Sequence, residues 1–193
     1  RQVLFQMGEP GSAFAVVLSG AYKLTKHSPI GSDVIVHFST PGDVIAALIM
    51  SQPKSMFPVS AVSMGPSRAV VIPRETYVKV WKNNPELIFR IQNLLSTRMH
   101  LLQNHKMLTR APLAQRVADL LLNLADQKTK QGSALELSLP LTRKEIADSL
   151  GSSVEAVIRI MSDWSKLGYI STSDQQIRVE RADKIIDISI GAE

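Results

Sequence analysis

The sequence contains no cysteine among its 193 residues. This absence excludes disulfides, a thiolate nucleophile and any zinc or iron–sulfur site held by cysteine ligands. No stretch approaches the roughly 18 apolar residues that cross a bilayer, and the start, Arg1-Gln-Val-Leu-Phe5, lacks the charged-then-apolar pattern of a secretion signal. We therefore expect a cytoplasmic protein without membrane contact. Because the first residue is not methionine and strand-like sequence follows at once, we also expect leading residues of the natural protein to be missing.

The sequence also lacks the motifs of common enzymes. It contains no nucleophile elbow, phosphate-binding loop or paired metal ligands, so we predict no catalytic activity. A haem held by histidine is the alternative for His37, His100 and His105. However, His37 alternates with valines, and a five-residue step between the other two does not align ligands on one helical face. Histidines that face solvent or a partner are favoured, and we predict no metal or cofactor.

Residues 141–168 contain the signals of two short helices joined by a tight turn. Thr142 with Glu145 three positions later predicts a capping box, and Gly151 supplies the left-handed residue that reverses the chain. Ser152 or Ser153 can cap the second helix. Its core-facing positions recur at three- and four-residue steps: Val157, Ile160, Met161, Trp164 and Leu167. The pattern predicts a helix-turn-helix, with an ordinary helical hairpin as the alternative.

The segment after the second helix favours a DNA-binding interpretation. Residues 169–180 form two alternating runs around a Ser-Asp turn, which predicts a β-hairpin placed like a wing. On the second helix, the side opposite the core carries Val154, Glu155, Ile158 and Arg159 in the first two turns, where a recognition helix contacts base edges. The order helix, turn, helix and wing is more specific than a hairpin alone.

These residues resemble the Crp/Fnr family of bacterial transcription regulators, the family of the cyclic-AMP receptor protein and FNR. The segment Ser153-Val-Glu-Ala-Val-Ile-Arg159 is similar to the start of the family's recognition helix, and the FNR form is closer. The resemblance implies that Glu155 accepts from cytosine and Arg159 donates to guanine, within a TGA-like half-site. It implies that Val154 and Ile158 read thymine methyls or no base. It places four further residues near DNA phosphates: Thr142, Arg143, Lys144 and Ser153. Without cysteine, the oxygen-sensing cluster of FNR cannot form.

The first part of the chain has the pattern of short strands separated by glycines. The expected strands are 3–5, 13–18, 21–25, 33–38, 59–63 and 69–72. Residues 5–20 and 38–43 resemble the double-stranded β-helix of cyclic-nucleotide-binding domains. We predict an α+β protein with three parts: an antiparallel β-roll sensor over 1–83, a dimerisation helix over 84–110 and a winged helix-turn-helix over 111–193. Within the last part, residues 112–127 predict a helix and 135–139 a strand.

The predicted effector pocket lacks the family's charged anchors. Where nucleotide-binding members carry Gly-Glu-Leu and Arg-Ser-Ala, this chain has Ala46-Ala47-Leu48 and Val59-Ser60-Ala61. Alanine and valine can bind neither a ribose hydroxyl nor a cyclic phosphate, so we predict no ordinary response to cyclic AMP. Asp43 or Lys54 could substitute, but both are more typical of surface loops, and residues 52–58 predict a loop in place of the phosphate-binding helix. Two residues of the long helix are placed in the pocket by position: His100 and Leu101.

A long helix is predicted from Asn84 to about Leu108. Asn84 can cap it, Pro85 suits its first turn and Glu86 suits its positive end. Its apolar residues form two stripes, one to pack on the roll and one to form a parallel seam with a second chain. The residues assigned to dimerisation are Leu87, Ile91, Leu94, Leu95, Met99, Leu101, Leu102 and Leu108. A helix buried inside a larger monomer is the alternative.

The net charge of +5 does not by itself argue for DNA binding. Residues 1–110 carry 12 lysines and arginines against 5 acids, whereas residues 111–193 carry 10 against 12. The prediction therefore depends on where cations and hydroxyls lie. We predict a homodimeric regulator whose partners are double-stranded DNA, RNA polymerase and an unidentified small-molecule effector. The alternative is a ligand-sensing or protein-interaction module with weak or vestigial DNA binding.

Overall fold

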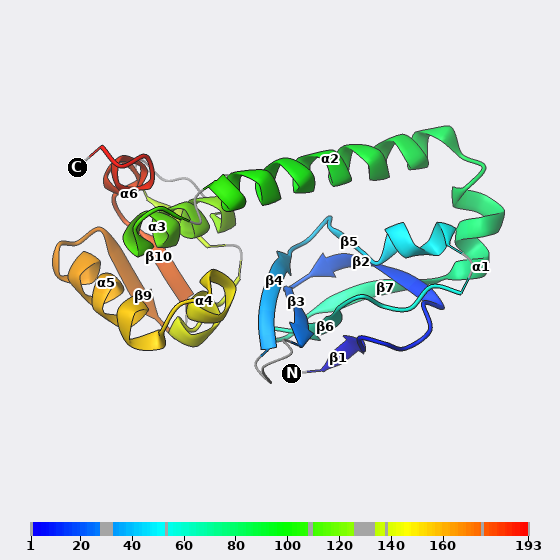
Figure 1. Ribbon diagram of the computed structural model, residues 1–193, viewed down its shortest axis with the longest axis horizontal. Coiled ribbons are helices and arrows are strands. Elements are labelled where there is room, and N and C mark those ends of the chain that lie inside the picture. The colour runs from blue at the N-terminus through cyan, green and yellow to red at the C-terminus, as the bar shows by residue number, and fades with distance from the viewer. Residues whose placement is uncertain are drawn as a thin grey trace. The chain divides into compact units, whose positions relative to one another are not determined.

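The protein is represented by a computed structural model, which describes residues 2–27, 33–52, 54–107, 110–125, 134–137, 139–174 and 176–192. It divides into two compact units, residues 1–104 and residues 105–193 (Figure 1). Each unit has its own hydrophobic core, and each is described by itself. Among the described residues, no helix is long and apolar enough to span a membrane.

The first unit is an antiparallel β-roll made of two sheets. The larger sheet has the strand order β1-β6-β3-β4 and the smaller one β5-β2-β7. The strands are β1 Val3–Phe5, β2 Ala13–Ser19, β3 Tyr22–His27, β4 Asp33–Ser39, β5 Val44–Ile45, β6 Ser60–Ser63 and β7 Arg68–Pro73. The pairing of β3 with β4 aligns Tyr22 with Ser39 and has an irregular register between Leu24 and Thr25. The predicted fold class, α+β with an N-terminal antiparallel roll, is confirmed.

The core of the roll is built around aromatic side chains. Phe14 is fully buried and meets Tyr77 and Trp81 edge-on, with ring centroids 6.1 and 4.7 Å away. On another side, Phe5 stacks on Phe57 at 4.4 Å. Aromatic pairs at such separations add to the stability gained from burying their surface. These contacts hold the strands against the helical segments that follow them.

Short helical segments complete the roll. They are the 3-10 helix η1 Ala47–Ser51, the α-helical turn α1 Arg74–Thr76 and the π-helical turn η2 Tyr77–Trp81. No element was predicted for residues 74–81, where Val78 and Val80 are β-branched and disfavour a helix. The helical turn forms because it places Tyr77 and Trp81 against Phe14.

The predicted long helix is α2 Pro85–Met107. Asn84 lies before it, and its Oδ1 accepts from the backbone N–H groups of Glu86 and Leu87 at 3.1 and 3.3 Å. Ile88 and Ile91 pack against the roll cluster that contains Phe14. The first half of α2 is therefore part of the roll's core.

The second unit is a helical head with a three-stranded sheet. Its elements are α3 Leu113–Leu124, β8 Leu135–Glu136, α4 Arg143–Leu150, α5 Val154–Lys166, β9 Ile170–Ser173, β10 Gln176–Val179 and α6 Ala182–Ser189. The sheet has the order β8-β10-β9, and Val179 pairs with both Leu135 and Ile170. Its core contains fully buried residues from α3, α4, α5, α6 and β10: Val117, Leu121, Ile146, Val157, Ile177 and Ile185. The winged helix-turn-helix predicted from the sequence is therefore present, and α6 is an addition to it.

Candidate functional site

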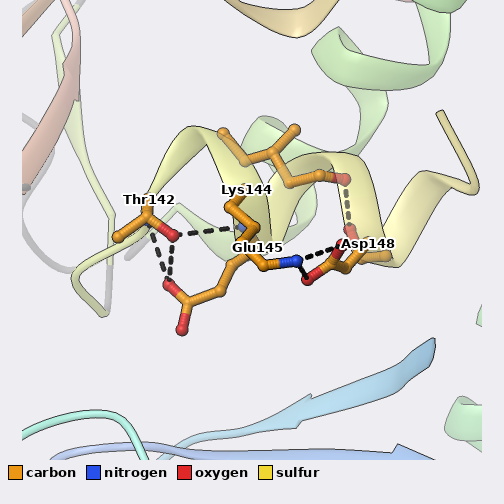
Figure 2. Close-up of polar contacts among 6 residues, drawn as sticks. Thr142, Lys144, Glu145 and Asp148 are labelled. Atoms are coloured by element: carbon orange, nitrogen blue, oxygen red, sulfur yellow. Dashed lines mark hydrogen bonds and ion pairs between the residues drawn. The ribbon is translucent and has the colours of Figure 1, made fainter. Parts of the chain in front are cut away.

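Helix α4 starts with the predicted capping box (Figure 2). The hydroxyl of Thr142 accepts from the backbone N–H of Glu145 at 3.1 Å. In return, the Glu145 carboxylate accepts from the backbone N–H of Thr142 at 3.1 Å and from its hydroxyl at 2.9 Å. Glu145 is only 4% exposed, so this reciprocal capping also satisfies a buried charge. The start of α4 is thereby fixed by its own sequence.

The turn between α4 and α5 is also the one predicted. Gly151 has φ +59°, and its N–H donates to the carbonyl of Ala147, which closes the last turn of α4. The guanidinium of Arg116, on α3, donates to the carbonyl of Leu150. Ser153 then caps α5, with its hydroxyl accepting from the N–H of Ala156 at 3.2 Å. The sequence carried no signal for the contribution of Arg116, because it depends on tertiary contact.

Helix α5 buries one face and exposes the other. Val157, Met161 and Trp164 are buried, as predicted, and Ile160 is half-buried. The prediction that Leu167 faces the core is wrong, since this residue is 61% exposed. The helix ends at Lys166, so Leu167 lies in the turn before Gly168 and leaves the apolar face.

The four predicted base-reading residues lie on the first two turns of α5. Glu155 and Arg159 are exposed, four positions apart on one face, and Ile158 beside them is 47% exposed. Val154 is half-buried. In the part of the chain that the structure describes, neither Glu155 nor Arg159 forms an ion pair with another residue. Their charged groups are therefore available to a ligand without breaking an internal contact.

The predicted phosphate-contacting residues all make contacts within the head. Lys144 pairs with Asp148 one turn later at 3.0 Å (Figure 2), an exposed pair of little energetic weight. Arg143 donates to the hydroxyl of Thr172 on β9 at 2.9 Å, and burial lowers the pKa of its guanidinium from its ordinary value. Thr142 and Ser153 use their hydroxyls as caps. Arg143 thus joins α4 to the wing through this hydrogen bond, a contact that was not predicted from the sequence.

The wing is a hairpin of β9 and β10. Ile170 pairs with Val179 near its base, and Gln176 pairs with Ser173 near its tip. Asp174, at the turn, has φ +48°, a conformation that aspartate tolerates better than most residues. The exposed strand β9 is rich in hydroxyl groups, which can donate to phosphate oxygens.

The first unit contains a cavity of about 170 Å³ between the roll and α2. Among the predicted pocket residues, Ala46, Ala47, Leu48 and Val59 line it. Ser60 does not line it, and its hydroxyl accepts from the backbone N–H of Met7 at 2.9 Å. His100 is exposed and is not in the lining, and the side chain of Leu101 lies outside the described residues. A cavity is therefore present at four of the positions predicted for the effector pocket, and the described α2 residues that line it are Ile91, Leu94 and Leu95.

Several of the α2 residues predicted for the dimer seam also line the cavity. Ile91 and Leu95, both assigned to that seam, are half-buried and line the cavity. Leu94 also lines it, although 42% of this residue is exposed. Leu87 is half-buried and Met99 is 56% exposed. The side chains of Leu101 and Leu102, and all of Leu108, lie outside the described residues. The two apolar stripes are neighbours on the helix, and their spacing alone could not decide which one the roll covers.

Ala46 lies at the start of η1 with φ +68° and ψ +10°, a left-handed conformation that disfavours a residue with a Cβ atom. We expect Ala46→Gly to raise the free energy of unfolding by about 1 kcal/mol, because glycine removes this strain. Urea unfolding followed by circular dichroism measures the change. The control is Ala69→Gly in β7, where glycine should lower stability because no such strain exists. A loss of stability in both variants would contradict the interpretation.

Comparison with known proteins agrees with this architecture. Residues 1–84 match the model of the cyclic nucleotide-binding domain, and residues 115–188 match the Crp-like helix-turn-helix domain. A "CRP-like cAMP-activated global transcriptional regulator" of Mycobacterium tuberculosis is 27% identical over 184 residues, which cover 94% of this chain and 82% of the relative. The "Transcriptional activator protein anr" of Pseudomonas aeruginosa is 29% identical, and the match covers 92% of this chain and 73% of the relative.

Solved structures give the same result. FixK2 from Bradyrhizobium japonicum superposes with a TM-score of 0.80 at 21% identity, over 97% of this chain and 92% of that one, which supports the fold. A "putative cyclic nucleotide binding protein" from Ruegeria pomeroyi is 28% identical with a TM-score of 0.68. The match covers 98% of this chain and 82% of that one. The chain belongs to the Crp/Fnr family of DNA-binding transcription regulators. This is a family of regulators rather than of enzymes.

Proposed function

We propose that the protein is a homodimeric, sequence-specific regulator that binds a near-palindromic operator with TGA-like half-sites. The observation that carries the proposal is the position of Glu155 and Arg159, side by side and exposed at the start of α5. A recognition helix contacts base edges with its first turns, and successive half-sites lie about 34 Å apart. Two copies of the head would therefore enter successive major grooves.

The chemistry of the two side chains suits the proposed bases. The Arg159 guanidinium can donate two hydrogen bonds to O6 and N7 of guanine, and the Glu155 carboxylate can accept from the amino group of cytosine. Ile158 and Val154 can contact only apolar groups such as thymine methyls. Lys144 can exchange its weak pair with Asp148 for a DNA phosphate, since its own side chain is 73% exposed.

We assign residues 1–83 to the sensing roll, 84–110 to the dimer helix and 111–193 to the DNA-binding head. Leu87 and Leu94 are proposed for the dimer seam, together with Leu101 and Leu108 further along the same stripe. A regulator bound to chromosomal DNA acts in the cytoplasm, and RNA polymerase is its proposed protein partner.

Cyclic AMP is not the proposed signal. Ala47 and Val59 line the cavity at the positions of the family's two charged anchors, and neither side chain can pair with a ribose hydroxyl or a phosphate. A phosphate charge buried without a partner would cost several kcal/mol, about enough to abolish binding at cellular concentrations.

The test is equilibrium binding of the full chain to two duplexes, one with two TGA half-sites and one with both half-sites scrambled. We expect the TGA duplex to bind at least about 1,000-fold more tightly at the same salt concentration. Affinity should fall steeply as salt rises from 50 to 200 mM, by about 1,000-fold if six phosphates are contacted. Cyclic AMP should leave the Kd unchanged. The mass of the free protein should be that of two 21.2-kDa chains.

Equal affinity for the two duplexes would contradict base reading and favour the alternative, a sensing or interaction module with vestigial DNA binding. A monomeric mass would contradict the dimer separately, because the head could still bind one half-site. A large gain in affinity with cyclic AMP would contradict the proposed loss of nucleotide sensing.

A further inference from the structure

The described side chains that line the cavity of the first unit are apolar except for Asp43. Its lining comes from the roll and from the first half of α2, and among the described residues Asp43 is the only charged one in it. The carboxylate of Asp43 accepts from the backbone N–H of Thr40 at 2.8 Å and lies 3.4 Å from its hydroxyl. This carboxylate is held by its own loop, and its negative charge would repel an anionic ligand.

Among the described residues, no cation lines the cavity to replace the missing anchors. Arg74, on α1, donates to the carbonyls of Met50 and Gln52 at 3.2 and 2.6 Å and is not in the lining. Lys54 is exposed and also outside the lining. A ligand that carries a phosphate or a carboxylate would therefore lose its hydration without gaining a cationic side chain among the described lining residues.

The shape of the cavity favours an aromatic or similarly compact apolar molecule. The stacked rings of Phe5 and Phe57 contribute to one part of the lining, and Ile91, Leu94 and Leu95 of α2 contribute to another. An apolar cavity of about 150 Å³ is large enough to hold benzene, and this one measures about 170 Å³. Leu48 and Leu94 are 57% and 42% exposed, so the cavity has a rim that solvent reaches.

From these observations we propose that the cavity binds a small, uncharged, apolar ligand of about the size of a substituted benzene. The ligand would contact α2 directly through Ile91, Leu94 and Leu95. The proposal rests on the proposed function, because it gives the effector class for the sensing roll of that regulator. Binding of such a ligand differs from nucleotide binding because it requires no charged group on the ligand and none in the cavity.

The test is a fluorine NMR titration of fluorobenzene with the full chain, without DNA. We expect saturable binding of one molecule per chain with a Kd of about 1 mM or tighter. Benzoate, which adds a carboxylate to the same ring, and cyclic AMP should not displace the probe. Leu95→Trp should fill the cavity and weaken binding at least 10-fold, because Leu95 is half-buried in the lining. The matched control is Phe89→Trp, on the same helix but outside the lining and 62% exposed, which should leave binding unchanged.

Circular dichroism shows whether each variant folds, and Val59→Phe provides a second way to fill the cavity if Leu95→Trp does not fold. Fluorobenzene binding that never saturates, or that is equal in the wild type and the filled variants, would overturn the proposal. Displacement by benzoate or cyclic AMP would overturn the ligand class. Since DNA is absent, failure of operator binding would refute the proposed function and leave this result intact.

Discussion

Arg159→Ala is expected to weaken binding of the TGA operator by about 30-fold or more. A bidentate arginine–guanine contact contributes about 1–3 kcal/mol of discrimination, and a homodimer loses it at both half-sites. The variant should fold normally, because Arg159 is exposed and forms no ion pair within the described residues. Equilibrium binding to the TGA and scrambled duplexes at fixed salt measures the effect.

Two further variants separate base reading from charge. Arg159→Lys keeps the charge but loses the planar pair of donors, so its affinity for the TGA duplex should fall nearly as far. Lys166→Ala, at the other end of α5, removes one exposed charge and should change affinity for both duplexes alike. Replacing the guanine of the half-site should strongly lower the affinity of the wild-type protein for the duplex. The same replacement should change the affinity of the Arg159→Ala variant only slightly. If Arg159→Ala still discriminated against that change, Arg159 would not be the residue that reads the guanine.

Gly20→Ala is expected to lower the free energy of unfolding of the roll by about 2–5 kcal/mol. Gly20 lies between β2 and β3 with φ +72°, where a residue with a Cβ atom costs about 1–2 kcal/mol. The new Cβ would lie 2.4 Å from the carbonyl oxygen of Pro66 and 2.7 Å from the Cα of Ser67. Both are backbone atoms, so relief of the clash requires the strands to move, at about 1–3 kcal/mol more. Urea unfolding measures the loss.

Gly8→Ala is the matched control for this prediction. Gly8 has φ +85°, but nothing lies within 4 Å of the position of an added Cβ. Its substitution should therefore cost only the backbone strain, about 1–2 kcal/mol. Equal losses in the two variants would mean that the β2–β3 corner adapts to a side chain at position 20.

The helix-turn-helix was predictable because its signals are local. Thr142 with Glu145, Gly151 and Ser153 satisfy backbone groups within one or two turns, and each occupies the predicted position in the structure. The position of Leu167 was not predictable in the same way. Periodicity continues the apolar face to this residue, whereas the helix stops one residue earlier.

The face of α2 that the roll covers was predictable only in part. Two neighbouring apolar stripes predicted two contacts, but the residue at their border, Ile91, could belong to either one. Its position depends on Phe14 and Trp81, which come from distant parts of the chain. Helix α6 was not predicted, and it follows the last predicted strand of the wing.

The contact between Arg116 and the carbonyl of Leu150 affects how a signal can reach DNA. Together with the left-handed Gly151, it holds the junction of α4 and α5 rigid before any duplex arrives. Because such a head does not have to refold on binding, little conformational entropy is lost when it associates with DNA. In the proposed dimer, the separation and orientation of the two heads then remain as the quantities that the proposed effector can alter.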